Sequence, residues 1–225
     1  CNPLELYKYI MDKNAGIKNL IKVSRVYLTF LEQSGEFPIE IIEKYRSILK
    51  IKHNKQDFYV PDDKEVVKNY RLIKSNPKLN IIYLILATSG IRYVECMDFL
   101  KSFEPNRFQI HSKFVSYNVS ELRHTKNINA IYLPNFVYKQ LKHVSNNHNA
   151  ISQRFKDNKC TFTLKYLRKW HYNFMLYNNI PESVADFIQG RANKSVSANH
   201  YLAKSQQASF WYGKIVKKFE KIIKN

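Results

Sequence analysis

An arginine stands just after a sharp chain turn in the segment Thr88-Ser89-Gly90-Ile91-Arg92-Tyr93-Val94-Glu95. The apolar run before it ends at Gly90, and glycine permits the positive φ that such a turn needs. We expect Arg92 to begin the next helix against a rigid core, with Glu95 one turn further on to orient it. An arginine held there can bind a phosphate through two nitrogen donors. The simpler alternative is a surface ion pair between Arg92 and Glu95.

Two further cations lie on a helix predicted over Thr163–Asn178. At about 100° per residue, the large apolar side chains of this helix fall within one sector of roughly 80°. These residues are Leu167, Trp170, Phe174 and Tyr177. Lys165 and Arg168 lie one turn apart on the opposite side, together with Tyr172. An ordinary solvated basic face would give the same local pattern.

A third segment pairs a cation with a possible nucleophile. Gln189-Gly190-Arg191 is followed, ten residues after Arg191, by Tyr201. The chain has 16 tyrosines, so spacing alone does not single out Tyr201.

The net charge indicates a polyanionic partner. The chain has 37 Lys and Arg against 18 Asp and Glu, a formal charge of +19, which is self-repulsive unless an anion screens it. The basic residues are interleaved with Tyr, Asn, Ser and Thr instead of lying beside an apolar anchor, which favours nucleic acid over a membrane. If about ten of them neutralise phosphates on duplex DNA, the log–log salt slope of binding would be roughly −9.

Several functional classes are excluded by what the sequence lacks. The cysteines Cys1, Cys96 and Cys160 are widely separated and form no CxxC pair, which argues against a disulfide scaffold or zinc site and predicts a reducing, intracellular compartment. No stretch approaches the ~20 apolar residues of a membrane span, and no signal peptide is visible. Because the chain begins with Cys, we expect it to be a fragment of something longer.

The elements that must position these residues fall into two units. Apolar residues recur at helical spacing from Leu4 to about Leu49, which predicts two or three short helices. A basic, polar linker follows over Lys50–Asp63, with a domain boundary near residue 56. A larger unit then begins with a helix capped by an Asp of Pro61-Asp62-Asp63.

The larger unit is predicted to combine helices with a small sheet. The run Ile81–Ala87 is apolar on all sides and should be a buried helix that stops at Ser89-Gly90. Phe108–Tyr117 and Ala130–Leu133 are rich in β-branched and aromatic residues and predict strands, with a polar loop containing Lys126 between them. From Asn135 the pattern is helical to the end. The last helix, about Ala208–Ile223, either packs on its own domain or docks on a neighbouring subunit.

In combination and in this order, the segments resemble the tyrosine recombinase (phage integrase) family. The family's Thr-Gly-Leu-Arg-x-x-Glu box corresponds to Thr88 through Glu95, with one extra residue between Thr and Gly. Its β-hairpin lysine corresponds to Lys126 in His124-Thr125-Lys126-Asn127. Lys165-Tyr166-Leu167-Arg168-Lys169 takes the place of the His-x-Leu-Arg-His box, with lysines for both histidines. Gln189-Gly190-Arg191 takes the place of Leu-Gly-His, and Tyr201 that of the nucleophile. These departures are similar to those of archaeal-virus (fusellovirus-type) integrases.

The resemblance implies a mainly α fold with a small antiparallel β-sheet, the tyrosine recombinase catalytic-domain fold, over residues 57–225. Residues 1–56 would be part of a helical core-binding, DNA-binding domain and its linker. The implied activity is site-specific recombination, here viral genome integration, on double-stranded DNA in the host cytoplasm or nucleoid. It needs no cofactor or small-molecule substrate, and the enzyme would work as a homo-tetramer on DNA.

The chemistry of this reaction explains why these residue types are needed. Attack of a phenol on a phosphodiester builds negative charge on the non-bridging oxygens, which a metal-free site must meet with fixed cations. Arg92, Arg168 and Arg191 would supply them, with Lys165 in support, and would favour the phenolate of Tyr201, whose reference pKa is ~10. By resemblance, Lys126 is the general acid for the departing 5′ oxygen. The sequence has no Asp, Glu and His cluster with metal-ligand spacing.

Two other functions share much of this pattern. A type IB topoisomerase-like enzyme would use the same cations and tyrosine to relax DNA as a monomer. A non-catalytic DNA-binding module could retain degenerate boxes, since both histidines are replaced. If Tyr201 is not the nucleophile, Tyr212 is among the next tyrosines to consider.

Overall fold

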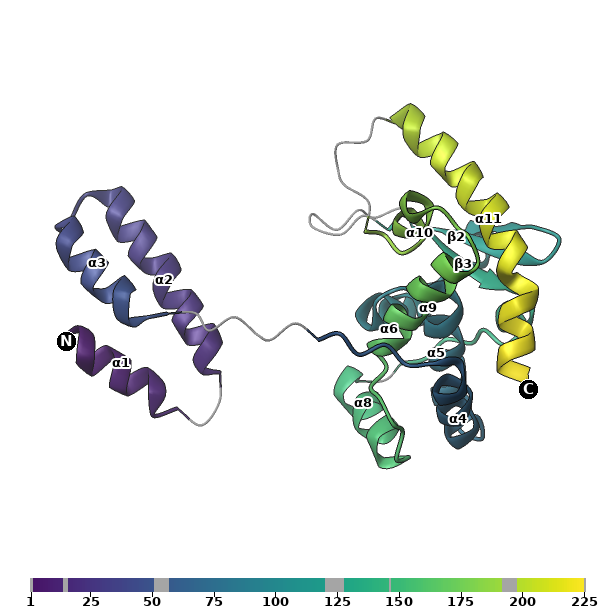
Figure 1. The fold of residues 1–225 in the computed structure, drawn as a ribbon, viewed down its shortest axis with the longest axis horizontal. Coiled ribbons are helices and arrows are strands. Elements are labelled where there is room, and N and C mark those ends of the chain that lie inside the picture. The colour runs from purple at the N-terminus through teal and green to yellow at the C-terminus, as the bar shows by residue number, and fades with distance from the viewer. Residues whose placement is uncertain are drawn as a thin grey trace. The chain divides into compact units, whose positions relative to one another are not determined.

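The computed structural model describes residues 2–13, 16–50, 57–119, 128–145, 147–191 and 198–224, with the backbone alone at residues 198–202 and 224. The described elements are mostly helices, with one small antiparallel sheet, and this confirms the predicted fold class (Figure 1). The chain divides into two units, Cys1–Phe58 and Tyr59–Asn225. The roles expected for residues 1–56 and 57–225 stay predictions.

Three helices form the first unit: α1 (Pro3–Met11), α2 (Ile17–Ser34) and α3 (Ile39–Ile48). Asn2 and Glu5 form a capping box that starts α1, with each side chain bonded to the other residue's backbone N–H at 2.9 Å. Apolar residues from all three helices form a small core: Ile10, Ile21, Leu28, Ile42 and Leu49.

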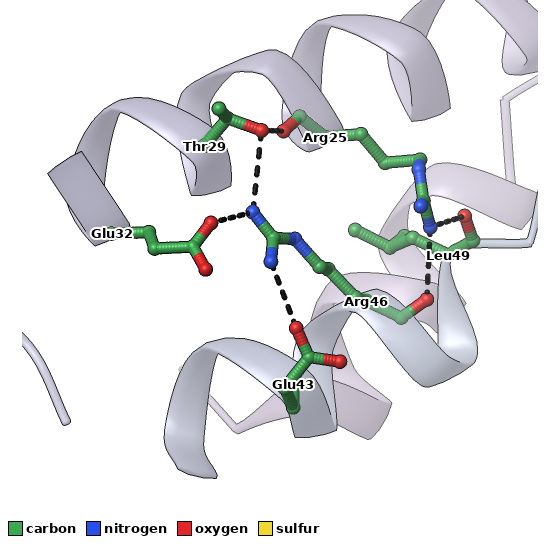
Figure 2. A network of polar contacts seen from close by, with 6 residues as sticks. All are labelled: Arg25, Thr29, Glu32, Glu43, Arg46 and Leu49. Atoms are coloured by element: carbon green, nitrogen blue, oxygen red, sulfur yellow. Dashed lines mark hydrogen bonds and ion pairs between the residues drawn. The ribbon is translucent and has the colours of Figure 1, made fainter. Parts of the chain in front are cut away.

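Polar contacts of two arginines join α2 to α3 (Figure 2). Arg46 pairs with Glu32 on α2 and with Glu43 one turn back on its own helix. Arg25 donates from Nη1 to the carbonyl oxygens of Arg46 and Leu49 at 3.2 and 3.3 Å, and so caps the C-terminal end of α3. These two cations therefore serve the packing of the first unit.

The second unit is built around α5 (Pro77–Ser89), which is buried from Leu79 to Ser89 except at Asn80. This confirms the buried helix predicted from its apolar run. Asn76 caps its start, and Gly90 ends it with a φ of 64°. The preceding helix α4 (Asp63–Ile73) is capped by Asp62, as the sequence predicts.

The sheet has the strand order β1-β2-β3 and is antiparallel throughout. Its strands are β1 (Phe108–Ile110), β2 (Phe114–Asn118) and β3 (Ala130–Pro134), with Ser116 opposite Tyr132. The stretch Phe108–Tyr117 thus forms most of a hairpin instead of a single strand, because the chain turns at residues 111–113. β3 is buried along its whole length and packs against α5 and α11.

The remaining helices surround α5 and the sheet. They are α6 (Tyr93–Ser102), α7 (Asn135–Tyr138), α8 (His148–Asp157), α9 (Tyr166–Tyr177), α10 (Glu182–Ile188) and α11 (Ala198–Lys224), with a 3-10 turn at Pro105–Arg107. Among the described residues no single helix is long and apolar enough to span a membrane; only the bent pair of α5 and α6 has the length and composition.

The last helix is longer than predicted and begins at Ala198 instead of Ala208. Its apolar face is buried against α4, α10 and the sheet. The buried residues are Ala208, Tyr212, Ile215, Val216, Phe219 and Ile223. The sequence left open whether this helix packs on its own domain or docks on a neighbouring subunit. The structure shows it packed on its own unit.

Candidate active site

Arg168 lies at the centre of a group of three arginines. Its Nη1 donates to the carbonyl oxygen of Gly90 at 2.7 Å. The pKa of Arg168 is lowered to about 9, first by burial and then by the positive charges of Arg92 and Arg191. The structure thus brings the three predicted arginines together, and Arg168 is half-buried instead of lying on a solvated face.

Arg92 occupies the N-cap of α6, immediately after the turn at Gly90. The carboxylate of Glu95 accepts from both the backbone N–H and Nη1 of Arg92, each at 2.7 Å. The ion pair considered for these residues therefore exists, but it belongs to the arginine group, because Arg92 also acts on the pKa of Arg168. The side chain of Glu95 is 13% exposed and that of Arg92 is 31% exposed. The more buried carboxylate therefore holds the guanidinium of Arg92 in one orientation.

Arg191 leaves the end of α10 through a glycine turn. Gly190 has a φ of 64°, its N–H donates to the Phe187 carbonyl at 3.0 Å, and the N–H of Arg191 donates to the Asp186 carbonyl at 2.7 Å. This pair of bonds is a Schellman motif, which stops a helix and turns the chain back across its end. The motif explains why a glycine precedes Arg191 and fixes where the arginine backbone emerges.

The guanidinium of Arg191 lies over the ring of Tyr172, 4.3 Å from its centroid. The hydroxyl of Tyr172 donates to Glu182 at 3.2 Å. Burial, followed by the charges of Asp186 and Glu182, raises the pKa of Tyr172 to about 12. Tyr172 therefore stays protonated at neutral pH and provides a cation–π platform for Arg191.

Two buried side chains to which the sequence analysis gives no role contact the arginine segments. Gln189 and His171 are both 0% exposed, and Gln189 Nε2 lies 2.9 Å from both the Arg168 carbonyl oxygen and His171 Nδ1. Burial, with a further contribution from the charges of Arg168 and Arg191, lowers the pKa of His171 to about 3. Gln189 immediately precedes Gly190, and His171 follows Arg168 by one helical turn. These positions are the signal in the sequence that both side chains lie near the arginines.

Of the other three predicted site residues, Lys165 is the one whose side chain the structure describes. Lys165 is exposed in the turn before α9, which begins at Tyr166, and its Nζ lies 4.7 Å from the Tyr166 ring centroid. It is not among the described charges that act on the pKa of Arg168. Lys126 lies outside the described residues. Tyr201 has its backbone in the first turn of α11, and its side chain lies outside the description.

Tyr212, the alternative tyrosine, is a structural residue. It is 0% exposed, and its hydroxyl lies 2.9 Å from the Thr88 carbonyl oxygen and 3.1 Å from that of Tyr132. Burial raises its pKa well above the ordinary value. A buried, protonated phenol of this kind cannot reach a DNA phosphate, so the structure excludes Tyr212 as the nucleophile.

The described residues contain no group of three or more His, Cys, Asp and Glu side chains that could hold a metal ion. Their site instead gathers guanidinium groups, which bind anions directly.

Comparisons with known proteins give one family and a general likeness of fold. A family model described as archaeal phage integrase matches residues 58–218. A crystal structure of XerA recombinase is 11% identical and covers 91% of this chain and 89% of its own, with a TM-score of 0.48. An integrase from mycobacterium phage Brujita is also 11% identical, covering 94% and 77%, with a TM-score of 0.47. No curated protein matches the chain. The family match spans most of the second unit, including all three arginines.

Proposed function

The chain belongs to the archaeal phage integrase family, and on this premise we propose that it cuts and rejoins DNA through a covalent bond between Tyr201 and a 3′ phosphate. Membership confirms the resemblance read from the sequence and makes the protein a site-specific recombinase of the integrase type. The residue roles and the order of steps below are part of the proposal.

The convergence of Arg92, Arg168 and Arg191 is the observation that carries this proposal. The pKa of Arg168 is lowered first by burial and then by the charges of Arg92 and Arg191, and both effects raise the free energy of the charged, unliganded site. A phosphodiester bound among them would offset the repulsion and accept charge-assisted hydrogen bonds. The stabilisation grows as negative charge builds on the non-bridging oxygens during attack, which is the requirement for catalysis.

In the proposed reaction the phenolate oxygen of Tyr201 attacks phosphorus and the bond from phosphorus to the 5′ oxygen breaks. Lys126 gives a proton to the departing oxygen, and Lys165 supports the arginines. The product is a 3′-phosphotyrosyl link and a free 5′-hydroxyl, and attack by a 5′-hydroxyl reverses the step without ATP. The place of Tyr201 in the first turn of α11 supports this role, because the positive end of a helix dipole favours an anion.

We propose double-stranded DNA as the partner, bound inside the host cell, with four copies of the chain acting on two sites. Residues 1–56 are proposed to be the end of a helical core-binding domain. Most of the positive charge lies elsewhere, because residues 1–58 have ten Lys and Arg against seven Asp and Glu, while residues 59–225 have 27 against 11. The second unit should therefore make most of the phosphate contacts.

A nicked suicide substrate tests the proposal. The wild-type chain should accumulate a covalent protein–DNA adduct, and Tyr201→Phe should form none. Tyr177→Phe is the matched control, because Tyr177 is 86% exposed and has no proposed role. An adduct that persists in Tyr201→Phe would place the nucleophile elsewhere. Wild-type protein that binds DNA without forming an adduct would be a non-catalytic module.

A second assay distinguishes recombination from relaxation. Strand exchange between two duplexes carrying the same site is expected of a recombinase and absent from a type IB topoisomerase-like enzyme. Relaxation of supercoiled DNA without any exchange would favour that enzyme over the proposal.

A further inference from the structure

The side-chain amide of Gln189 connects two parts of the arginine site. Both of its hydrogens have acceptors, since Nε2 lies 2.9 Å from the carbonyl oxygen of Arg168 and 2.9 Å from Nδ1 of His171. Its Oε1 has no hydrogen-bond partner in the described part of the chain. Gln189 therefore acts through its donors alone.

The hydrogen bonds of His171 fix its tautomer. Nε2 lies 3.0 Å from the Thr88 carbonyl oxygen, which can only accept, so the proton is on Nε2. Nδ1 then accepts from Gln189. The ring is also stacked on Phe219, with centroids 5.4 Å apart and planes 8° from parallel. His171 is thereby held as a neutral acceptor in one orientation.

Gly90 lies directly on this pair. A Cβ at Gly90 would be 2.3 Å from His171 Nδ1 and 2.4 Å from Gln189 Nε2, so the backbone approaches as closely as a glycine allows. The carbonyl of the same residue receives Nη1 of Arg168. The pair thus supports both the carbonyl that anchors the guanidinium and the backbone from which Arg168 extends.

We propose that Gln189 and His171 are positioning residues that hold Arg168 in the geometry needed for phosphate attack, without touching the DNA. This inference rests on the proposed function. Because Gln189 immediately precedes Gly190 and Arg191, the same contacts tie the segment of Arg191 to that of Arg168. The spacing between two of the three guanidinium groups is therefore set by one buried amide.

The first test measures the single-turnover rate of adduct formation on the suicide substrate in Gln189→Leu. Leucine has a similar length and removes the unpaired Oε1, but it cannot donate to the Arg168 carbonyl oxygen or to His171 Nδ1. The rate should fall about 100-fold, the cost of a misplaced catalytic group, while DNA affinity stays close to wild type. The control is Gln153→Leu, because the amide of Gln153 donates to Asp157 one turn on in the same helix, α8, and has no proposed role.

A matched pair at His171 tests the connection between the two residues. Asparagine keeps an oxygen acceptor facing Gln189, whereas leucine of nearly equal size has none. His171→Asn should react at least about tenfold faster than His171→Leu, which is the order of effect of one hydrogen bond. This comparison remains decisive if Gln189→Leu does not fold, because both His171 variants leave a similar cavity.

The outcomes separate this inference from the proposed function. If wild-type protein forms no adduct, the proposed function fails. If wild-type protein forms it, and either Gln189→Leu reacts at the wild-type rate or the two His171 variants react equally, the positioning role is wrong. A loss of rate matched by an equal loss of DNA affinity would also overturn it, because positioning should act on the chemical step alone.

Discussion

Nη1 of Arg168 lies 2.7 Å from the carbonyl oxygen of Gly90, although 78 residues separate the two in sequence. The turn that ends α5 therefore does more than redirect the chain toward Arg92. Its carbonyl points at the central guanidinium of the site, and its α-carbon rests on His171 and Gln189. The backbone at Gly90 is thus part of the geometry of all three arginines.

Replacing Gly90 with alanine should disrupt both the fold and the reaction. The φ of 64° and the contact at 2.3 Å with His171 Nδ1 predict a loss of about 1–3 kcal/mol in the free energy of unfolding. Adduct formation should fall sharply, because the backbone must shift to relieve the contact of the new Cβ with His171 and Gln189, and the carbonyl that accepts from Arg168 shifts with it. Gly35→Ala is the control, since Gly35 has a φ of 69° and nothing within 4 Å; it should show only backbone strain. Wild-type activity in Gly90→Ala would contradict this account.

The sequence is sufficient to predict those parts of the site whose residues are close together along the chain. The apolar run of α5, the glycine that ends it and the arginine that follows are consecutive, so the fold of that segment could be predicted. The convergence of Arg92, Arg168 and Arg191 followed from the order of the family boxes. Whether Lys126, Lys165 and Tyr201 complete the site stays a prediction.

Tertiary contacts explain what the sequence did not show. Gln189 and His171 interact across 18 positions, and no periodicity marks a buried polar pair of this kind. The start of α11 was also missed, because Asn199, His200, Lys204 and Ser205 show no apolar repeat. The sequence predicts Lys165 on a helical face, but α9 begins one residue later, and that places Lys165 in the preceding turn.

The buried imidazole of His171 should make the fold sensitive to acid. Its pKa is about 3 in the folded chain against 6.5 for the unperturbed group, so below pH 6.5 the unfolded state binds the extra proton. Its contribution to stability is complete above pH 6.5 and is lost as pH falls toward 3; between pH 7 and 5 the loss is about 2 kcal/mol. Urea unfolding at both pH values should show this difference in wild type and a smaller one in His171→Asn. Equal differences would refute the assignment.

Tyr212→Phe should separate stability from chemistry. The variant removes the hydroxyl that bonds to the Thr88 and Tyr132 carbonyls, so the free energy of unfolding should fall by about 1 kcal/mol. The adduct should still form, in contrast to Tyr201→Phe. Loss of the adduct in a folded Tyr212→Phe variant would mean that Tyr212 also influences the reaction.

The rate of adduct formation should vary little with pH between about 6 and 8, where an ordinary histidine titrates. By the resemblance read from the sequence, Lys165 takes the place of the first histidine of the family's His-x-Leu-Arg-His box. The pKa of about 3 keeps His171 neutral throughout that range. Lys165→His should restore a titration near neutrality. Single-turnover rates across the range provide the measurement, and a bell-shaped profile centred near pH 6.5 in wild type would count against this prediction.

DNA affinity should depend on salt mainly through the second unit. About ten neutralised phosphates would give a log–log slope of roughly −9, and each lost phosphate contact reduces its magnitude by about 0.9. Residues 59–225 carry 27 of the 37 basic residues, while Arg25 and Arg46 of the first unit are engaged in joining α2 to α3.

The double variant Arg92→Gln, Arg191→Gln should therefore reduce the magnitude of the log–log salt slope by about 2. The matched variant Lys22→Gln, Lys44→Gln, at two exposed positions of the first unit, should change it by less than about 1. Binding titrations from 50 to 200 mM salt, roughly the range over which such slopes are measured, give both values, and an equal reduction in the two variants would mean that the first unit contacts phosphates as extensively as the arginine site does.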